Sequence, residues 1–382
     1  MQSTTVFYWI YDVTESKLQL GLIGLAEVIP AVGMSLLSGH IVDQSEKRKS
    51  LLLCLLAYFF MAIGVLLFTS PSITSSIGLQ NSIYAVFGLI FIGGIIRSFV
   101  SPSNFALMGL LLPKEEYANA ASWSSMSWQL GGTIGPMLAG MVIGLCDVHL
   151  SFQIVVGLLL IPLFAIFQIS KKPIVKKDKK EPILLSIQEG LNFVFKTPII
   201  LGALALDLFS VLLGGAMALL PVFQRDILKV SEFDFGLMRS APGLGAIITI
   251  SILAFLPLKK QAGKKLFLCV AGFGLSMIVF GLSKNFYLSI IMLVVSGMLD
   301  AVSVVIRGII LQLYTPEHMR GRVASVNTMF ISSSNELGDF ESGLMAHWLG
   351  PVRAVVVGGM LTLGVVAFTF YKSPHLRKFE VE

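Results

Sequence analysis

The chain is built from apolar runs of about 20 residues that are separated by short polar breaks. A helix of about 20 residues rises about 30 Å, which matches the hydrocarbon thickness of a bilayer. Backbone groups in lipid must be hydrogen-bonded within their own segment, so these runs are predicted to be helices. The alternating ten-residue pattern of a membrane barrel is absent from the sequence. Charged residues make up only 13% of the 382 residues, which excludes an ordinary soluble domain. The chain is therefore predicted to be an all-α membrane protein.

Twelve membrane spans are predicted, six on each side of a polar connector. They cover residues 1–12, 19–42, 50–69, 82–112, 119–145, 151–169, 198–222, 236–258, 266–282, 286–313, 323–347 and 351–371. The sequence thus predicts two six-helix bundles, at 1–170 and 198–382. The linker between them, 171–197, begins with a basic run and ends in an amphipathic helix over 183–196.

A degenerate internal repeat supports this division into halves. Gly24–Gly33 (GLAEVIPAVG) and Gly236–Gly245 (GLMRSAPGLG) both follow G-L-x-x-x-x-P-x-x-G at an offset of 212. A second pair of segments, beginning at Pro113 and Pro316, agrees at an offset of 203. Two pseudo-symmetric halves around a shared centre are typical of secondary transporters.

The net charge of +6 indicates topology rather than nucleic-acid binding, because the basic residues lack interleaved aromatic residues or a recognition motif. Loops on one side of the predicted spans hold 20 Lys and Arg, and loops on the other side hold five. The positive-inside rule places the richer side, with both termini, in the cytoplasm. The predicted location is a bacterial cytoplasmic membrane.

The first span is shorter than the others. Only about 12 residues precede the first external loop, about 17 Å of helix. The 212-residue repeat places the counterpart of the seventh span about 14 residues before Met1. We therefore expect the first helix to be truncated, with a start upstream of Met1.

The loop between the second and third spans carries a family signature. The major facilitator superfamily has G-x-x-x-D-[RK]-x-G-[RK]-[RK] in this loop, and the chain resembles it. Four positions fit this signature: Gly39, Asp43, Lys47 and Arg48. Gln44 and Glu46 depart from it. The resemblance implies a clasp of carboxylate and cations that holds one conformation of an alternating cycle.

The fifth span resembles the exporter signature of the same superfamily. Gly131-Gly-Thr-Ile-Gly135-Pro136-Met-Leu-Ala-Gly140 has glycines on one face and a proline that bends the helix. A bare G-x-x-x-G would indicate helix packing only. The fuller pattern implies export rather than import.

A third region looks like the enterobactin-exporter-like and macrolide-efflux-like branch of the superfamily. It comprises the Arg320-Gly321-Arg322 element and the segment that follows it up to Gly343. The two arginines belong to the implied clasp, or serve simply as cytoplasmic anchors. The resemblance covers nearly the whole chain. It implies a proton antiporter that exports a small amphiphilic molecule, such as a siderophore or a drug.

Charged residues inside predicted spans are the candidate proton and substrate sites, since each is costly in lipid unless paired or hydrated. The candidates are Glu27, Arg97, Asp207, Asp300, Arg307, Glu336 and Asp339. Asp300 and Arg307 are seven residues apart, which places them on one helical face. Glu336 and Asp339 are three residues apart and also share a face. Arg239 is assigned to the membrane interface. Structural ion pairs are the alternative for each of them.

No enzyme or cofactor site is indicated. The sequence has no G-x-x-x-x-G-K-[ST] loop for ATP, no catalytic constellation and no metal-ligand spacing of His or Cys. The predicted partners are the bilayer, a small-molecule substrate and protons, because a carboxylate in a semi-apolar cavity can exchange protons near neutrality. The alternatives are a proton-coupled importer of a small nutrient and, less favoured, a membrane receptor or enzyme.

Overall fold

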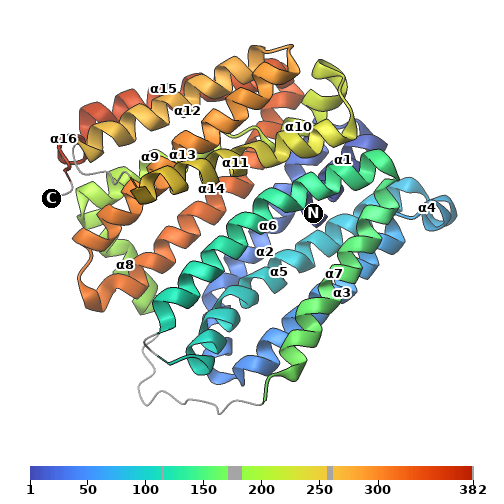
Figure 1. The fold of residues 1–382 in the computed structure, drawn as a ribbon, viewed down its shortest axis with the longest axis horizontal. Helices are drawn as coiled ribbons and strands as arrows, with labels where there is room; N and C mark the ends of the chain where they lie inside the picture. The colour runs from blue at the N-terminus through green and yellow to red at the C-terminus, as the bar shows by residue number, and fades with distance from the viewer. Residues whose placement is uncertain (114–115, 171–182, 256–260, 381–382) are drawn as a thin grey trace.

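The structure, a computed structural model, describes residues 1–113, 116–170, 183–255 and 261–380. In these ranges the regular elements are all helices (Figure 1). The first half contains α1 (Gln2–Thr14), α2 (Lys17–Gln44), α3 (Lys47–Phe68), α4 (Pro71–Ile77), α5 (Leu79–Leu111), α6 (Tyr117–Leu145) and α7 (Val148–Gln168). The second half contains α8 (Ile183–Lys196), α9 (Pro198–Gly214), η2 (Met217–Leu219), α10 (Leu220–Val222), η3 (Phe223–Leu228), α11 (Glu232–Phe255), α12 (Ala262–Leu282), α13 (Phe286–Tyr314), η4 (Glu317–Met319), α14 (Arg320–Leu349), α15 (Pro351–Lys372) and α16 (Pro374–Arg377).

The predicted all-helical membrane fold is confirmed. Each of the twelve predicted spans coincides with a helix or, for 198–222, with a run of helical segments. Nine stretches in the described ranges are long and apolar enough to cross a bilayer. The helices outside that set are short, as α1 is, or rich in polar side chains, as α6 and α14 are.

The two halves repeat one specific packing contact. A Cβ added at Gly94 of α5 would lie 2.7 Å from Cγ of Pro30 of α2. A Cβ added at Gly297 of α13 would collide with the backbone of Pro242 of α11. Position 297 is 203 after 94, and 242 is 212 after 30. A glycine therefore receives the in-helix proline of the neighbouring helix in both halves, at the offsets of the internal repeat.

Glycines also hold the two bundles together at one end of the molecule. A Cβ at Gly140 of α6 would lie 2.5 Å from Cα of Gly236 of α11, and a Cβ at Gly343 of α14 would lie 2.6 Å from Cα of Gly21 of α2. Backbones this close leave room for nothing larger than hydrogen. A buried apolar cluster seals the same end, and it joins α1 of the first bundle to η2, η3 and α11 of the second.

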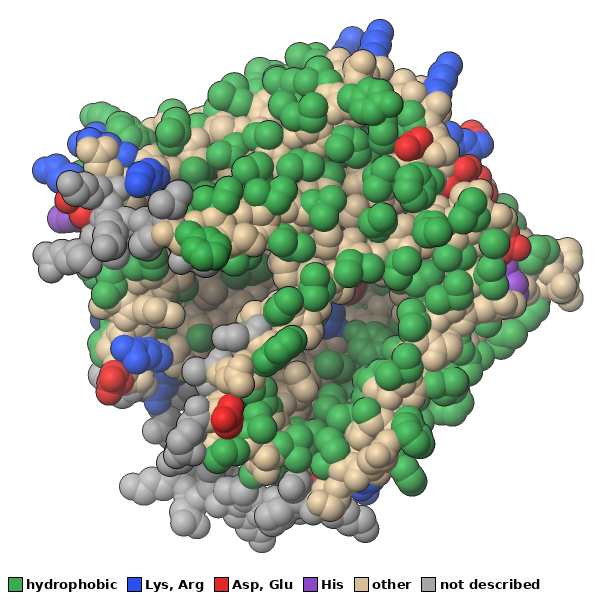
Figure 2. Space-filling model, viewed as in Figure 1, with side chains coloured by type: hydrophobic (Ala, Val, Ile, Leu, Met, Phe, Trp, Pro, Cys, Tyr) green, Lys and Arg blue, Asp and Glu red, His purple; other side chains and the backbone are tan. Residues whose placement is uncertain are grey.

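The bundles separate towards the opposite end, which carries α8 and α16 (Figure 1). A Cβ at Gly131 or Gly132 in the first half of α6 would meet nothing within 4 Å. The surface is visibly hollowed between the two bundles on this side (Figure 2). The molecule is thus closed at one end and open at the other.

The predicted continuous span over 198–222 is interrupted. Helix α9 ends at Gly214, and a short 3-10 turn, one α-turn and a π-helix follow it. Interrupting a helix frees carbonyl groups that lipid cannot satisfy. The carbonyl of Gly215 accepts a hydrogen bond from the Ser342 hydroxyl at 2.7 Å, and that of Met217 accepts one from the Arg239 guanidinium at 3.0 Å. Neighbouring helices therefore stabilise the break.

Candidate functional site

One arginine joins the two bundles. Arg97, on α5, donates to Glu27 of α2 at 2.5 Å. Its other terminal nitrogen lies 2.5 Å from a carboxylate oxygen of Glu336 on α14. The side chains of Arg97 and Glu27 are 37% and 29% exposed, whereas that of Glu336 is only 9% exposed. Three of the residues that the sequence singled out thus form one ionic group, two from the first bundle and one from the second.

Close helix approach makes this group possible. A Cβ at Gly24 of α2 would run into the carbonyl of Glu336 and would lie 3.0 Å from Cβ of Asp339. Glu336 and Asp339 share a face of α14, as their spacing predicts, and Gly24 lets that face lie directly on α2. We call Glu27, Arg97, Glu336 and Asp339 the inter-bundle site.

Arg239 belongs to the boundary between the bundles rather than to the lipid interface. Its guanidinium donates to Met217, lies 3.4 Å from the Ser3 hydroxyl and stacks 4.7 Å from the centre of the Phe7 ring. Sequence reasoning assigned this arginine elsewhere because it lies near the start of an apolar run. The available signal was its repeat position, 212 residues after Glu27.

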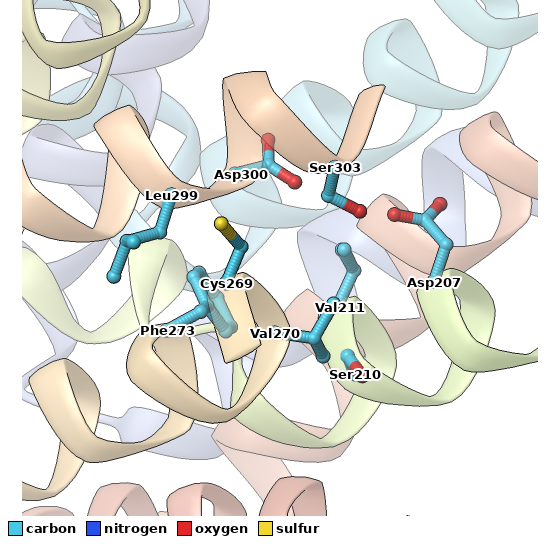
Figure 3. Close-up of a pocket in the computed structure, with 9 residues that line it drawn as sticks. All are labelled: Asp207, Ser210, Val211, Cys269, Val270, Phe273, Leu299, Asp300 and Ser303. Atoms are coloured by element: carbon cyan, nitrogen blue, oxygen red, sulfur yellow. The ribbon is translucent and has the colours of Figure 1, made fainter. Parts of the chain in front are cut away.

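A second polar cluster lies inside the C-terminal bundle, between α9, α12 and α13 (Figure 3). Arg307 of α13 forms an ion pair with Asp207 of α9, and their side chains are 4% and 9% exposed. Asp207 and Asp300 both line a cavity of about 10 Å³, together with Ser210, Cys269 and Ser303. Arg307 is thus paired with the neighbouring helix rather than with Asp300 on its own helix.

The residues of the implied clasp bind the ends of helices. Lys47 is buried and donates to the carbonyl of Val42 at 2.5 Å. Arg48 donates to the carbonyls of Ile166 and Phe167, at 3.2 and 2.8 Å, where α7 ends. Cations at a helix C-terminus complete the free carbonyls and the helix dipole. The surroundings of Gly39 and the side chain of Asp43 are outside what the structure describes, so the clasp remains a prediction.

The two arginines of the Arg-Gly-Arg element have different surroundings. Arg322 forms an ion pair with Glu189 of α8 at 2.6 Å, which fastens the linker helix to the start of α14. Arg320 is 57% exposed and lies 3.8 Å from Glu317. Arg322 therefore links α14 to the distant helix α8, whereas Arg320 lies near a residue only three positions before it.

The glycines of the exporter-like helix are used unequally. Gly140 packs against Gly236, and Pro136 offers its carbonyl to the same contact. A Cβ at Gly135 would lie 2.9 Å from the nitrogen of Met1, and one at Gly131 would touch nothing. The glycine face of α6 is thus in contact only at the closed end of the molecule.

Ionic and hydrogen-bonded ties cross between the bundles beyond the apolar seal. Arg225 of η3 lies 3.3 Å from Asp12 and 3.0 Å from Glu15 at the end of α1. Tyr11 donates to Asp226 of the same π-helix, and Tyr8 donates to Glu232 of α11 at 3.2 Å. Sequence reasoning missed these residues, because a loop carboxylate or tyrosine gives no signal of its partner 200 positions away.

The described residues contain no group of His, Cys, Asp and Glu side chains arranged to hold a metal ion. The arrangement of paired charges at the seam between two bundles suits reversible binding and a change of partners, rather than bond making.

The comparisons with known proteins agree with this geometry. The family model described as transmembrane secretion effector matches residues 1–382. The chain is 24% identical over 364 residues to the enterobactin exporter EntS of Shigella boydii serotype 18, covering 94% of this chain and 84% of that protein. It is 25% identical, with the same coverage, to the enterobactin exporter EntS of Escherichia coli O81.

Solved structures of transporters share the fold. The crystal structure of a D-xylose–proton symporter aligns with a TM-score of 0.75 and 13% identity, covering 99% of this chain and 96% of that one. A bacterial homologue of the iron transporter ferroportin, in an inward-facing state, aligns with a TM-score of 0.70 and 15% identity over the same shares of the two chains.

Proposed function

The chain belongs to the transmembrane secretion effector family of major facilitator transporters, and from that premise we propose that it exports a small amphiphilic molecule in exchange for protons. The protein is a multi-pass membrane transporter, and its relatives are transporters rather than enzymes. We place it in a bacterial cytoplasmic membrane with both termini inside, because the positive-inside rule assigns the loops rich in Lys and Arg to the cytoplasm.

The ionic group of Glu27, Arg97 and Glu336 carries the proposal. It ties α2 and α5 to α14 beside the hollow, where a substrate entering from the open end would arrive. Rocking one bundle against the other would separate Arg97 from Glu336, because they belong to different bundles. A substrate that competes for either group would therefore change the balance between the two conformations.

The substrate class is inferred from the relatives and from the kind of site. The relatives are enterobactin exporters, and enterobactin is a siderophore. The inter-bundle site combines charged groups with surrounding apolar helices, which suits a molecule that has polar and apolar parts. We propose a siderophore first and a drug-like amphiphile second.

Everted membrane vesicles test both the direction and the coupling of transport. Vesicles that contain the protein should accumulate radiolabelled enterobactin when an inward-acidic proton gradient is imposed. A protonophore should abolish the accumulation, and the reversed gradient, with the lumen alkaline, should drive none. A parallel assay with a labelled macrolide tests the drug-like alternative.

The variant Arg97→Gln serves as the site control, and the exposed Arg353→Gln on α15 serves as the matched surface control. Only Arg97→Gln should lose accumulation. Uptake driven only by the reversed gradient, with the lumen alkaline, would indicate a proton symporter and hence an importer. Accumulation that a protonophore leaves intact would contradict proton coupling.

A further inference from the structure

We infer that the coupling proton is held inside the C-terminal bundle, shared by Asp207 and Asp300, at a site separate from the place where substrate binds. This inference rests on the proposed function, since it assigns the proton of that exchange to two named carboxylates. Figure 3 shows both carboxylates, one from α9 and one from α13, on the walls of the same small cavity.

The charges around this cavity do not balance. Asp207 and Asp300 supply two carboxylates, and Arg307 supplies one cation, which pairs with Asp207. Asp300 has no ion pair among the described residues. An unpaired carboxylate within a membrane bundle is costly, and binding one proton removes that cost. Because the two carboxylates line one cavity and a single ion pair neutralises only one of them, the proton belongs to the pair rather than to a fixed oxygen.

The described residues of the three helices that line the cavity place no second cation on its wall. Helix α12 contributes Cys269, Val270 and Phe273 to the wall, and its Lys265, one turn from Cys269, is exposed. Helix α9 adds the hydroxyl of Ser210, and α13 that of Ser303.

Helix α14 also packs against α9. Its acidic residues contact residues other than Asp207, Asp300 and Arg307, or form no ion pair with a described residue. Glu336 is paired with Arg97, and Asp339 lies against Gly24. Glu341 forms no ion pair with a described residue. No ion pair from a neighbouring helix therefore joins Asp300, and the imbalance at Asp207, Asp300 and Arg307 stands within the described residues.

The size of the cavity selects a proton over larger ligands. Its volume is about 10 Å³, and about 10–15 Å³ is needed for a single water molecule. An amphiphilic substrate cannot enter, and a metal cation would find no space for a shell of oxygen ligands. A proton needs no volume, and one water in the cavity would carry it between the two carboxylates and the hydroxyls of Ser210 and Ser303.

Arg307 lies where it can pair with whichever of the two carboxylates is ionised. It lies seven residues after Asp300 on the same face of α13, about 10 Å along the helix axis. In the described conformation it pairs with Asp207, which leaves the proton on Asp300. When the proton moves to Asp207, the guanidinium gains Asp300 as its ionised partner. Loading and release of the proton would thus reorient an ion pair that links α9 to α13.

The inter-bundle site also holds more carboxylates than arginines, but its position differs. Arg97 and Glu27 are 37% and 29% exposed beside the hollow, so water and substrate can compensate their charge. Arg307 and Asp207 are 4% and 9% exposed. The Arg307–Asp207 pair is thus more enclosed than the inter-bundle site, while Asp300 is half-buried. A proton shared by Asp207 and Asp300 can therefore be held while the substrate site is open.

Infrared difference spectroscopy of the protein in lipid nanodiscs tests the inference without any substrate. A pH titration of the wild type should show the carbonyl band of a buried protonated carboxylic acid, which disappears as pH rises. Asp300→Asn and Asp207→Asn should each remove one such acid, because the remaining carboxylate pairs with Arg307. Glu317→Gln, at a side chain that is 89% exposed, should leave the band unchanged.

A charge-neutral double variant covers the case in which a single substitution prevents folding. Asp207→Asn with Arg307→Gln leaves Asp300 alone in the cavity and should retain the band, at a higher pH than in the wild type. The inference is overturned if the band survives in both single variants, or is missing from the folded double variant. Export of enterobactin by wild-type vesicles is a separate result. If export occurs and the carbonyl band is unchanged by these substitutions, the assignment of the proton site is wrong and the proposed function stands.

Discussion

The Arg97 guanidinium lies 2.5 Å from a carboxylate oxygen of Glu336, across the boundary between the two bundles. The second oxygen of Glu336 is buried and accepts no hydrogen bond within the described structure. This carboxylate therefore depends on an arginine that the opposite bundle presents. Any motion that parts the bundles at this level leaves Glu336 without its counter-charge. The conformational change is thereby coupled to the group that next pairs with the Glu336 carboxylate.

Replacing Arg97 by Gln should both destabilise the described conformation and stop transport. Removing one partner of a buried pair typically costs about 3–5 kcal/mol, and the partial exposure of Arg97 reduces that figure to about 1–3 kcal/mol. The unfolding midpoint in nanodiscs and the initial rate of enterobactin export measure the two effects. We expect the rate to fall at least about tenfold.

The double variant Arg97→Gln with Glu336→Gln separates the two effects. It removes the carboxylate that is buried, and the one left without its arginine, Glu27, is 29% exposed and can be hydrated. The double variant should therefore regain most of the lost stability while remaining inactive. A double variant that is as unstable as the single one would show that Arg97 acts through packing rather than charge.

Arg225 should bias the protein towards the described conformation. Its pairs with Asp12 and Glu15 are exposed, and each is worth about 0–1 kcal/mol. Arg225→Ala should therefore shift the equilibrium by a few-fold towards the conformation that opens at this end, and high salt should have a similar effect on the wild type. Spin labels placed on α1 and α11 would report the separation. Lys229→Gln, a nearby change of the same charge, should leave the distances unchanged.

The glycines of α6 should respond to alanine with opposite signs. Gly140→Ala forces apart two touching backbones, at a cost of about 1–3 kcal/mol, against about 1 kcal/mol gained in helix propensity. A Cβ at position 131 would have free space in this conformation. Gly131→Ala should therefore be stabilised by the gain in helix propensity, with no cost from a collision. Thermal unfolding of the two variants checks this. Equal shifts would mean that the contact between Gly140 and Gly236 does not limit the approach of the bundles.

Cysteine labelling checks the orientation in the membrane. With Cys54, Cys146 and Cys269 replaced, Lys284→Cys between α12 and α13 should react in intact cells with an impermeant maleimide. Lys378→Cys, after α16, should react only once the cells are permeabilised. Both residues are exposed. Reaction of both in intact cells would refute the positive-inside assignment.

The sequence determined the helices because the bilayer imposes a length and a polarity on each segment separately. A run of apolar residues such as the predicted span 50–69 must form a helix whatever surrounds it, and the structure has α3 over Lys47–Phe68. The pairing of the in-helix prolines with glycines at Gly94 and Gly297 was beyond reach, because it requires knowing which helices touch. The interruption after Gly214 was also hidden within a continuous apolar run.

For the candidate site, the sequence identified the charged residues, and the tertiary structure chose their partners. A charge in an apolar run stands out by itself, which is why Arg97, Glu336 and Arg307 could be named in advance. The spacing along α13 favoured Asp300 as the partner of Arg307, yet the ion pair goes to Asp207 on another helix. Local spacing specifies which side chains share a face. Packing between helices decides which faces meet, since that depends on contacts between residues hundreds of positions apart.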